Sequence, residues 1–278
     1  MYERQVNVIF FKKHLQILLV LGSLLSAGSL QAQINTEAMR QQDLGLGSHF
    51  MLGANLSFIQ GNSSIFQSHL KSRWDYILAR SNFFIILNQK ISRKDDKVFI
   101  NQGFGHIRAV KNVTHKLQGE LFLQQEYNEF INLQSRKLIG LGIRVSHQNP
   151  TQVPNNPAAL AFVLGLGFMF EQEEMDAGPL GLLGDPVHGE LARLLRSSNY
   201  VVVKWAPSPS LSVTTTSYYQ VDTRRLADYR MLSQSQARLG LTEKLALNFT
   251  LNLRYDSEPP ANIENLDLEF SQGLTYSF

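Results

Sequence analysis

Charged side chains recur at alternate positions inside long, otherwise apolar segments of this 278-residue sequence. A period of two places such residues together on one face of a β-strand. If that face lines the lumen of a barrel, the charges either brace the wall as ion pairs or form a constriction that selects small solutes. Both alternatives follow from the pattern. The candidate lumen-lining charges are Lys71, Arg73, Glu120, Glu126, Arg136, Arg144, Lys204, Arg238, Arg254, Asp267 and Glu269.

Hairpin spacing pairs some of these charges. A last hairpin closing at 256–265 would place Arg254 directly across from Asp267. A turn at 128–134 would place Glu126 across from Arg136 in the same way. Opposite charges across a strand pair support its register by about 0.2–1 kcal/mol.

Catalytic and metal chemistry is not expected. None of the histidines after residue 33 is followed by the Ser-Asn pair that outer-membrane phospholipases and deacylases show. The chain has no cysteine, which excludes disulfides, thiolate metal sites and cysteine nucleophiles. The acidic run "EQEEMD" (171–176) lies beside a predicted loop, where such runs are usually solvated. We therefore expect no enzyme, no cofactor and no metal, with a barrel-embedded lipid hydrolase as the alternative.

The N-terminus has the features of an export signal. Arg4, Lys12 and Lys13 precede the apolar run "LQILLVLGSLLSAGSL", and Ala32 is a small residue suited to cleavage. Residues 1–32 are therefore predicted to be a signal peptide, followed by a short periplasmic lead at 33–47. The signal contributes three basic residues and Glu3, a net +2, so the chain's charge of +3 falls to about +1 after cleavage. A balance so near neutrality argues against a nucleic-acid partner.

Residues 48–278 are predicted to form an all-β fold, an antiparallel up-and-down transmembrane β-barrel of twelve strands. Each segment has about 11–15 residues, whereas a tilted membrane strand needs about 9–11 and an ordinary strand averages about 5–6. No apolar run after residue 33 reaches the ~18 residues of a membrane helix. The expected strands are 48–60, 63–77, 81–91, 97–111, 115–128, 134–148, 157–171, 194–206, 210–222, 228–241, 244–256 and 265–278.

Two of these segments carry extra information. In 157–171 the large residues have one parity and the small ones the other, which suits a barrel with bulk outside and limited room inside. In 97–111 the apolar residues change parity, which predicts a bulge near Gly103 or Gly105. Short turns such as 78–81 and longer loops such as 256–265 alternate along the chain, as in outer-membrane barrels, although the 148–157 link is an exception.

The C-terminus ends in "LTYSF", with Leu274, Tyr276 and Phe278 at alternate positions. A last strand with a terminal aromatic residue is similar to the signal that outer-membrane barrels present to their assembly machinery. Residues 48–278 resemble a family of outer-membrane β-barrels that includes salt-induced outer-membrane proteins. The stretches "RKLIGLGIR" and "RYDSEPP" carry this resemblance most clearly. The resemblance implies location and fold, and it supplies no catalytic residues.

Together these features predict an integral protein of the outer membrane of a Gram-negative-type bacterium. Its expected partners are outer-membrane lipid and the barrel-assembly machinery, and the sequence indicates no particular oligomeric state. The expected role is structural, or it is that of a narrow passive pore for small solutes, which would make the protein a porin. A soluble secreted ligand-binding barrel is the other alternative.

Overall fold

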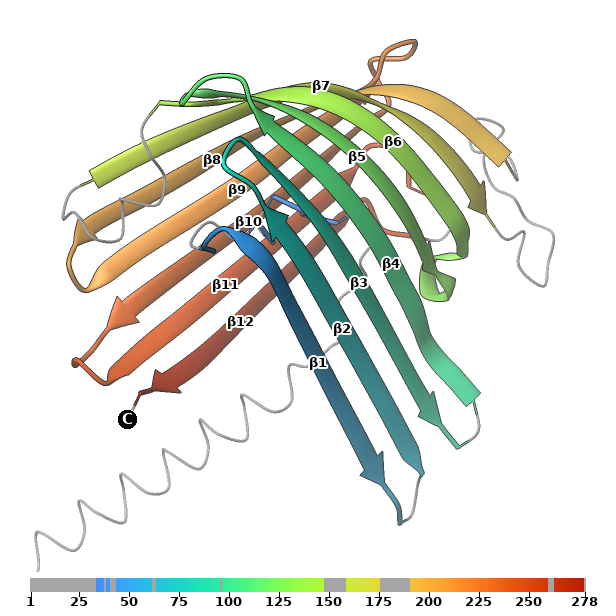
Figure 1. Cartoon of the computed structure of the whole chain (residues 1–278). Coiled ribbons are helices and arrows are strands. Elements are labelled where there is room, and N and C mark those ends of the chain that lie inside the picture. The colour runs from blue at the N-terminus through green and yellow to red at the C-terminus, as the bar shows by residue number, and fades with distance from the viewer. Residues whose placement is uncertain are drawn as a thin grey trace, which may run out of the picture.

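The computed structural model describes residues 34–37, 39–40, 44–61, 64–95, 97–147, 159–175, 191–259 and 263–277. Its twelve strands form one antiparallel up-and-down sheet in which each strand pairs with the next in sequence (Figure 1). The predicted signal peptide and Phe278 lie outside the described residues. The strands are β1 (Gly47–Ile59), β2 (Ile65–Ile77), β3 (Ser81–Lys94), β4 (Lys97–Asn112), β5 (Leu117–Asn128), β6 (Leu133–Ser146), β7 (Ala159–Met175), β8 (Leu191–Ser208), β9 (Leu211–Asp222), β10 (Tyr229–Gly240), β11 (Leu245–Asp256) and β12 (Leu266–Tyr276).

The sheet has two distinct ends. We call the end where β1 begins and β12 finishes the proximal end, and the opposite end the distal end. Turns of two to four residues, such as 78–80 and 209–210, make four of the five connections at the proximal end, and the exception, between β6 and β7, spans residues 147–158. The distal end carries the short 3-10 helix Glu129–Ile131 and the longest connection, between β7 and β8. In the described part of the chain, no helix is both long and apolar enough to cross a membrane.

The two faces of the sheet differ in side-chain character. On the concave side, here called the lumen, Val163 and Met169 of β7 are almost fully buried. On the convex side the large apolar residues of the same strand are 38–53% exposed. The predicted separation of bulk by parity in β7 is therefore confirmed. The convex residues are Leu160, Phe162, Leu164, Leu166, Phe168 and Phe170.

Aromatic rings cover glycines on the lumen side. The ring of Tyr200 on β8 occupies the space beside Gly165, where an added Cβ would lie 2.0 Å from ring carbon Cε1. The ring of Phe122 on β5 covers Gly140 on β6 in the same way, at 2.2 Å. The missing side chains thus make room for aromatic rings in a narrow lumen.

Gly165→Ala should destabilise the fold by about 1–3 kcal/mol, because the new methyl group forces the Tyr200 ring out of its position. The displacement would also break the hydrogen bond of 3.3 Å that the Tyr200 hydroxyl donates to Glu120. Gly53→Ala on β1 is the matched control, since its Cβ would meet nothing within 4 Å. Denaturant unfolding in detergent measures both, and equal midpoints would contradict the argument.

One strand irregularity differs from the prediction. The β3–β4 ladder pairs Ser92 with Ile100 and Arg93 with Val98, so Phe99 is the extra residue of a bulge. The bulge expected at Gly103 or Gly105 is therefore wrong in position, and Ile100 and Ile107 stay on opposite faces, because the ladder is regular between them. Gly103 serves another purpose, because a Cβ there would lie 2.9 Å from the ring of Tyr127.

The edges of the sheet are β1 and β12. The ladders among the described residues run from β1 to β12 in order, and none joins these two strands. Phe50 and Phe58 of β1 and Leu268 and Leu274 of β12 are correspondingly exposed. Lipid offers no hydrogen-bond partner to an edge, so a bilayer would require β1 and β12 to pair with each other.

Candidate functional site

The lumen holds two groups of charged side chains, one toward each end of the strands. The proximal cluster includes residues of the chain before β1, and the distal cluster includes the turn between β9 and β10. The proximal cluster consists of Glu37, Arg40, Arg73, Asp75, Arg108, Glu120 and Arg144. The distal cluster consists of Glu126, Arg136, Glu171, Glu173, Arg196, Asp228, Arg230 and Asp256.

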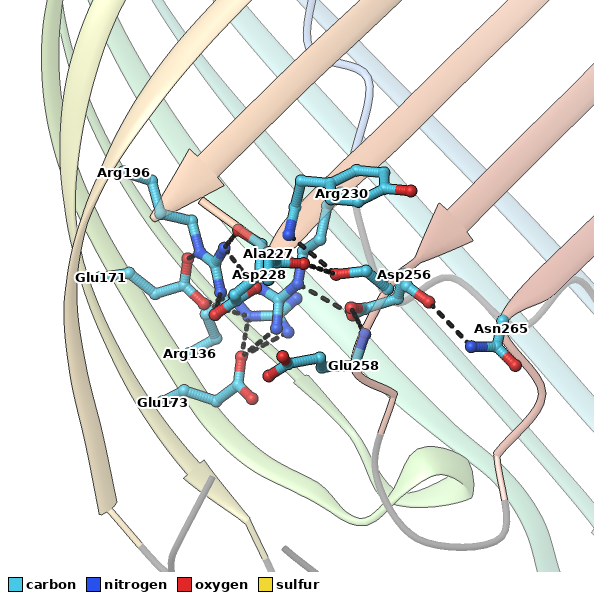
Figure 2. A network of polar contacts seen from close by, with 12 residues as sticks. Arg136, Glu171, Glu173, Arg196, Ala227, Asp228, Arg230, Asp256, Glu258 and Asn265 are labelled. Carbon is cyan, nitrogen blue, oxygen red and sulfur yellow. Dashed lines mark hydrogen bonds and ion pairs between the residues drawn. The ribbon is translucent and has the colours of Figure 1, made fainter. Parts of the chain in front are cut away.

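Arg196 of β8 is fully enclosed in the distal cluster, with a side chain that is 0% exposed, as is that of Glu171. Its Nε donates to Glu171 Oε2 at 3.0 Å. Its Nη1 and Nη2 donate to the two carboxylate oxygens of Asp228 at 2.8 and 3.0 Å, a bidentate arrangement (Figure 2). The turn that carries Asp228 is thereby fixed against the wall of the lumen.

Arg230 and Arg136 extend the same network across the lumen (Figure 2). Arg230 donates to Glu171 at 2.8 Å and to Asp256 at 2.9 Å. Arg136 donates to Glu126 at 2.7 Å and to Glu173. Ion pairs of this kind stay intact only where several hydrogen bonds offset the cost of taking the charges out of water.

The acidic run of β7 departs from the prediction. Glu171 and Glu173 were expected to be solvated beside a loop, but β7 continues to Met175 and turns both carboxylates into the lumen. Residues two apart on a strand share a face. Glu173 lies directly across from Arg136 in the β6–β7 ladder, which explains their contact.

The proximal cluster is organised around the segment Ile34–Arg40, which precedes β1. The carboxylate of Glu37 accepts from Arg40 at 2.9 Å, from Arg144 at 3.1 Å and from Arg108 at 3.4 Å. Arg40 also contacts Glu120 on β5. These contacts tie the segment to the walls formed by β4, β5 and β6.

The backbone and apolar residues of the segment add to this attachment. Arg108 donates to the Thr36 hydroxyl at 2.7 Å, and Arg73 donates to the Met39 carbonyl at 2.6 Å. Ile34 and Met39 pack against a buried cluster of β3 and β4 side chains that includes Phe84. The lead that we expected in the periplasm therefore has its described residues 34–37 and 39–40 inside the lumen.

The ion pairs shift the protonation of Glu37. Burial raises its pKa, but the guanidinium groups of Arg40, Arg144 and Arg108 lower it more, so the net pKa lies below the ordinary 4.5. A group whose pKa is lowered by folding contributes stability above its unfolded pKa and loses it as pH falls. Other polar groups nearby are Glu120 of β5, Tyr200 of β8, Tyr218 of β9 and Arg73 of β2.

We expect acid to loosen the segment, with its attachment complete above about pH 4.5 and lost progressively below it. A nitroxide on Asn35→Cys, the single cysteine of such a chain, would report this loss as faster motion in electron paramagnetic resonance spectra. With Glu37→Gln added, the label should already be mobile at pH 7 and show no comparable step. A label that is equally immobile at pH 7 and pH 3 in both proteins would contradict the assignment.

Between the two clusters the lumen is filled by aromatic and aliphatic side chains. Tyr200 and Tyr218 lie with ring centroids 5.0 Å apart and pack with Val163, Val202 and Leu232. A small cavity of about 60 Å³ extends from Ile34 and Thr36 past residues of both clusters. At about 10–15 Å³ per water, it has room for only a few water molecules.

Some of the predicted lumen charges come together and others do not. Glu126 lies opposite Arg136 and Arg254 opposite Asp267, so both predicted cross-strand registers are confirmed. Arg73, Glu120, Glu126, Arg136 and Arg144 are buried in the two clusters. Lys204, Arg254, Asp267 and Glu269 are half-buried, whereas Lys71 and Arg238 are exposed.

Several members of the clusters escaped the sequence prediction. Arg196 and Arg230 have the same parity as the predicted Lys204 and Arg238 on their strands, so the alternation alone could have found them. Arg108 was overlooked, although the bulge assigned near Gly103 would itself have turned this residue to the lumen, opposite in parity to Ile107 and Ala109. Glu37 and Arg40 gave no signal, because the segment before β1 has no periodic pattern.

The residues present suit ion pairing and anion contact rather than metal binding. In the described part of the chain, no group of three or more acidic, histidine or cysteine side chains is placed to hold a metal ion. His106 is buried and its Nδ1 lies 3.0 Å from Gln124 Oε1, within the lumen wall. The cationic groups of the lumen are guanidiniums, which bind carboxylates in a planar, forked geometry.

The fold and the lumen define a class: a twelve-stranded up-and-down β-sheet protein with an apolar exterior and a charged, filled interior. The chain belongs to the family described as "Protein of unknown function, DUF481", whose model matches residues 53–278. No curated protein matches the chain.

Two solved structures are similar in fold. The NanC porin, in a rhombohedral crystal form, has a TM-score of 0.44 and 8% identity, with 82% of this chain and 99% of that chain covered. The translocator domain of the autotransporter NalP from Neisseria meningitidis has a TM-score of 0.38 and 12% identity, with 95% and 96% covered.

Proposed function

We propose that this chain is an integral β-barrel of the outer membrane of a Gram-negative-type bacterium, and that its lumen is closed at rest. The convex face supports the membrane assignment. Leu164 and Phe168 of β7, Leu141 of β6 and Leu251 of β11 are among the many large apolar side chains exposed there. A contiguous apolar surface of this extent marks contact with lipid or protein.

The same proposal names two partners. Outer-membrane lipid covers the convex face, and the barrel-assembly machinery recognises the last strand. Leu274 and Tyr276 of β12 support the second assignment, since both are exposed on the convex side. Phe278, the terminal residue of the predicted signal, lies outside the described residues.

The structural role is the function that the geometry supports best, and one observation carries it: the lumen charges are buried against one another. The side chains of both clusters are 0–10% exposed, with Arg196 and Arg73 at the two ends of that range, except that of Asp256, which is 18% exposed. An aqueous pore would leave such charges in water, where ion pairs between them contribute little. A filled lumen instead suits a barrel that anchors or braces.

A narrow passive pore for small solutes is the second candidate, and the cavity favours it. The residues that line the cavity come from both clusters, and Ile34 and Thr36 of the N-terminal segment are among them. That segment is not part of the sheet, so its withdrawal would open the cavity at the proximal end without breaking any strand ladder.

Conductance in planar bilayers tests both candidates. The wild-type barrel should be silent, and a variant lacking residues 34–43 should conduct weakly through the constriction left by the distal cluster. Silence of both proteins would reject the pore and keep the structural barrel. Equal conductance of both would reject the closed lumen.

The membrane assignment has its own test. The mature protein should require detergent for extraction and should migrate faster on a gel before heating than after it. A mature protein that is soluble without detergent would overturn the proposal in favour of a secreted ligand-binding barrel. The proposal assigns no catalytic step, and lipid hydrolysis that depends on a serine and a histidine would contradict it.

A further inference from the structure

Arg144 differs from the other lumen arginines in where its carboxylate partner comes from. Arg73 pairs with Asp75 of its own strand, and Arg108 is 3.3 Å from Glu120 of β5. Arg144 is buried near the proximal end of β6, and its ion pair among the described residues is with Glu37 of the N-terminal segment. Its hydrogen bonds to other described residues are to neutral groups, Gln118 Oε1 at 2.9 Å and Ser146 Oγ at 3.2 Å.

The wall is therefore one carboxylate short when the segment is left out of account. The proximal strands contribute three guanidiniums, from Arg73, Arg108 and Arg144, against two carboxylates, from Asp75 and Glu120. Glu37 supplies a carboxylate within 3.4 Å of both Arg108 and Arg144, while Arg40 of the same segment pairs with Glu37 and with Glu120 of the wall. A buried cation without its counter-charge is costly, so a vacated site would favour another anion.

We propose that Arg108 and Arg144 form a binding site for a small carboxylate solute, and that Glu37 occupies this site as a resident ligand. The proposal rests on the closed lumen described above and adds the chemical class of the solute. A carboxylate fits because two guanidiniums converge on its oxygens. The adjoining cavity, lined by Arg108 and Glu120, gives room for the rest of a small molecule.

Rescue of a Glu37→Gly variant tests the site directly. Propionate has the same atoms as the deleted side chain from Cβ outward, so it can restore the carboxylate that Arg108 and Arg144 have lost. The variant is refolded into detergent with propionate, propionamide or chloride at equal ionic strength, which removes any barrier to entry. Samples are heated stepwise before electrophoresis, and the temperature at which the faster-migrating band of the folded protein disappears gives an apparent Tm.

Propionate well above its Kd should raise the apparent Tm of Glu37→Gly saturably, by about 2–4 °C, and propionamide and chloride should not. The double variant Glu37→Gly with Arg144→Gln should fold but lose this response. An equal effect of propionate and chloride would overturn the proposal, because it would reflect general screening. An equal effect of propionamide would also overturn the proposal, because the stabilisation would then come from filling the cavity left by the deleted side chain and not from the carboxylate.

Competition in the wild type tests whether a free carboxylate replaces Glu37. Trypsin should cut after Arg40 only when the segment leaves the lumen, because the side chain of Arg40 is buried. Propionate at ten times its Kd should raise that rate about tenfold, while cleavage after the exposed Arg80 stays constant. An unchanged rate at Arg40 would overturn the proposal.

Failure here is distinguishable from failure of the proposed function. A barrel that needs detergent, shows heat-modifiable migration and is silent in bilayers would retain its assignment even if propionate had no effect. Conversely, a soluble protein would refute the membrane barrel, whatever its response to propionate.

Discussion

Replacing Arg196 with methionine should destabilise the fold by about 3–5 kcal/mol, the largest effect expected of any single substitution here. The guanidinium is fully buried and holds Asp228 through two hydrogen bonds and Glu171 through a third. Methionine keeps much of the volume but leaves Asp228 without its bidentate partner and Glu171 with only Arg230 and Arg136. Unfolding in denaturant, with the wild type in the same detergent, measures the loss.

Arg225→Ala is the matched control for this experiment. Arg225 also approaches Asp228, at 4.0 Å, and pairs with Glu258, but its side chain is 37% exposed. An exposed ion pair contributes about 0–1 kcal/mol, so this substitution should be nearly neutral. Equal losses of stability from Arg225→Ala and Arg196→Met would mean that burial does not determine how much an ion pair of the distal cluster contributes to the free energy of unfolding.

Leu251→Arg should cost about 2–4 kcal/mol in a membrane-refolding assay. Leu251 is near the middle of β11 on the convex face and 40% exposed, so the new charge would lie in hydrocarbon. Asn252→Arg, one residue further on, should be tolerated far better. Asn252 faces the lumen and donates to Glu269 at 3.0 Å, so an arginine there would meet a carboxylate.

The comparison between these two substitutions tests the assignment of faces rather than overall stability. Both add the same side chain at nearly the same depth of the same strand. Equal damage from both would contradict an outward apolar face. Equal tolerance of both substitutions in a bilayer would contradict the assignment of the protein to a membrane.

The strands were predictable because alternation is a local property. In β11 the alternation predicted that Leu251 points away from the lumen and Asn252 into it, and the structure places both side chains in this way. The registers that pair Glu126 with Arg136 and Arg254 with Asp267 followed from turn length alone. The bulge was predicted at Gly103 or Gly105 because glycine inside a strand often marks a bulge, whereas it lies at Phe99. Gly103 instead leaves room for the ring of Tyr127.

The candidate site was only partly predictable, since its contacts are long-range. The parity of the small residues in β7 continues to Glu171 and Glu173, but the predicted strand ended at residue 171, so Glu173 lay outside it and the acidic run was assigned to a loop. The contact of Glu37 with Arg144 spans 107 residues. No periodicity links a short lead to a strand so distant, and only the folded chain brings the two together.

The N-terminal segment also has a bearing on electrical control. After the predicted cleavage, residues 33–43 carry two positive groups, the α-amino terminus and Arg40, and two negative ones, Glu37 and Asp43, so the formal charge is zero. A transmembrane potential does work of about 2.3 kcal/mol per elementary charge per 100 mV, and on a neutral segment that work vanishes. Withdrawal of the segment would thus be insensitive to voltage, unlike gating by a charged sensor, and would respond instead to protons and to dissolved carboxylates.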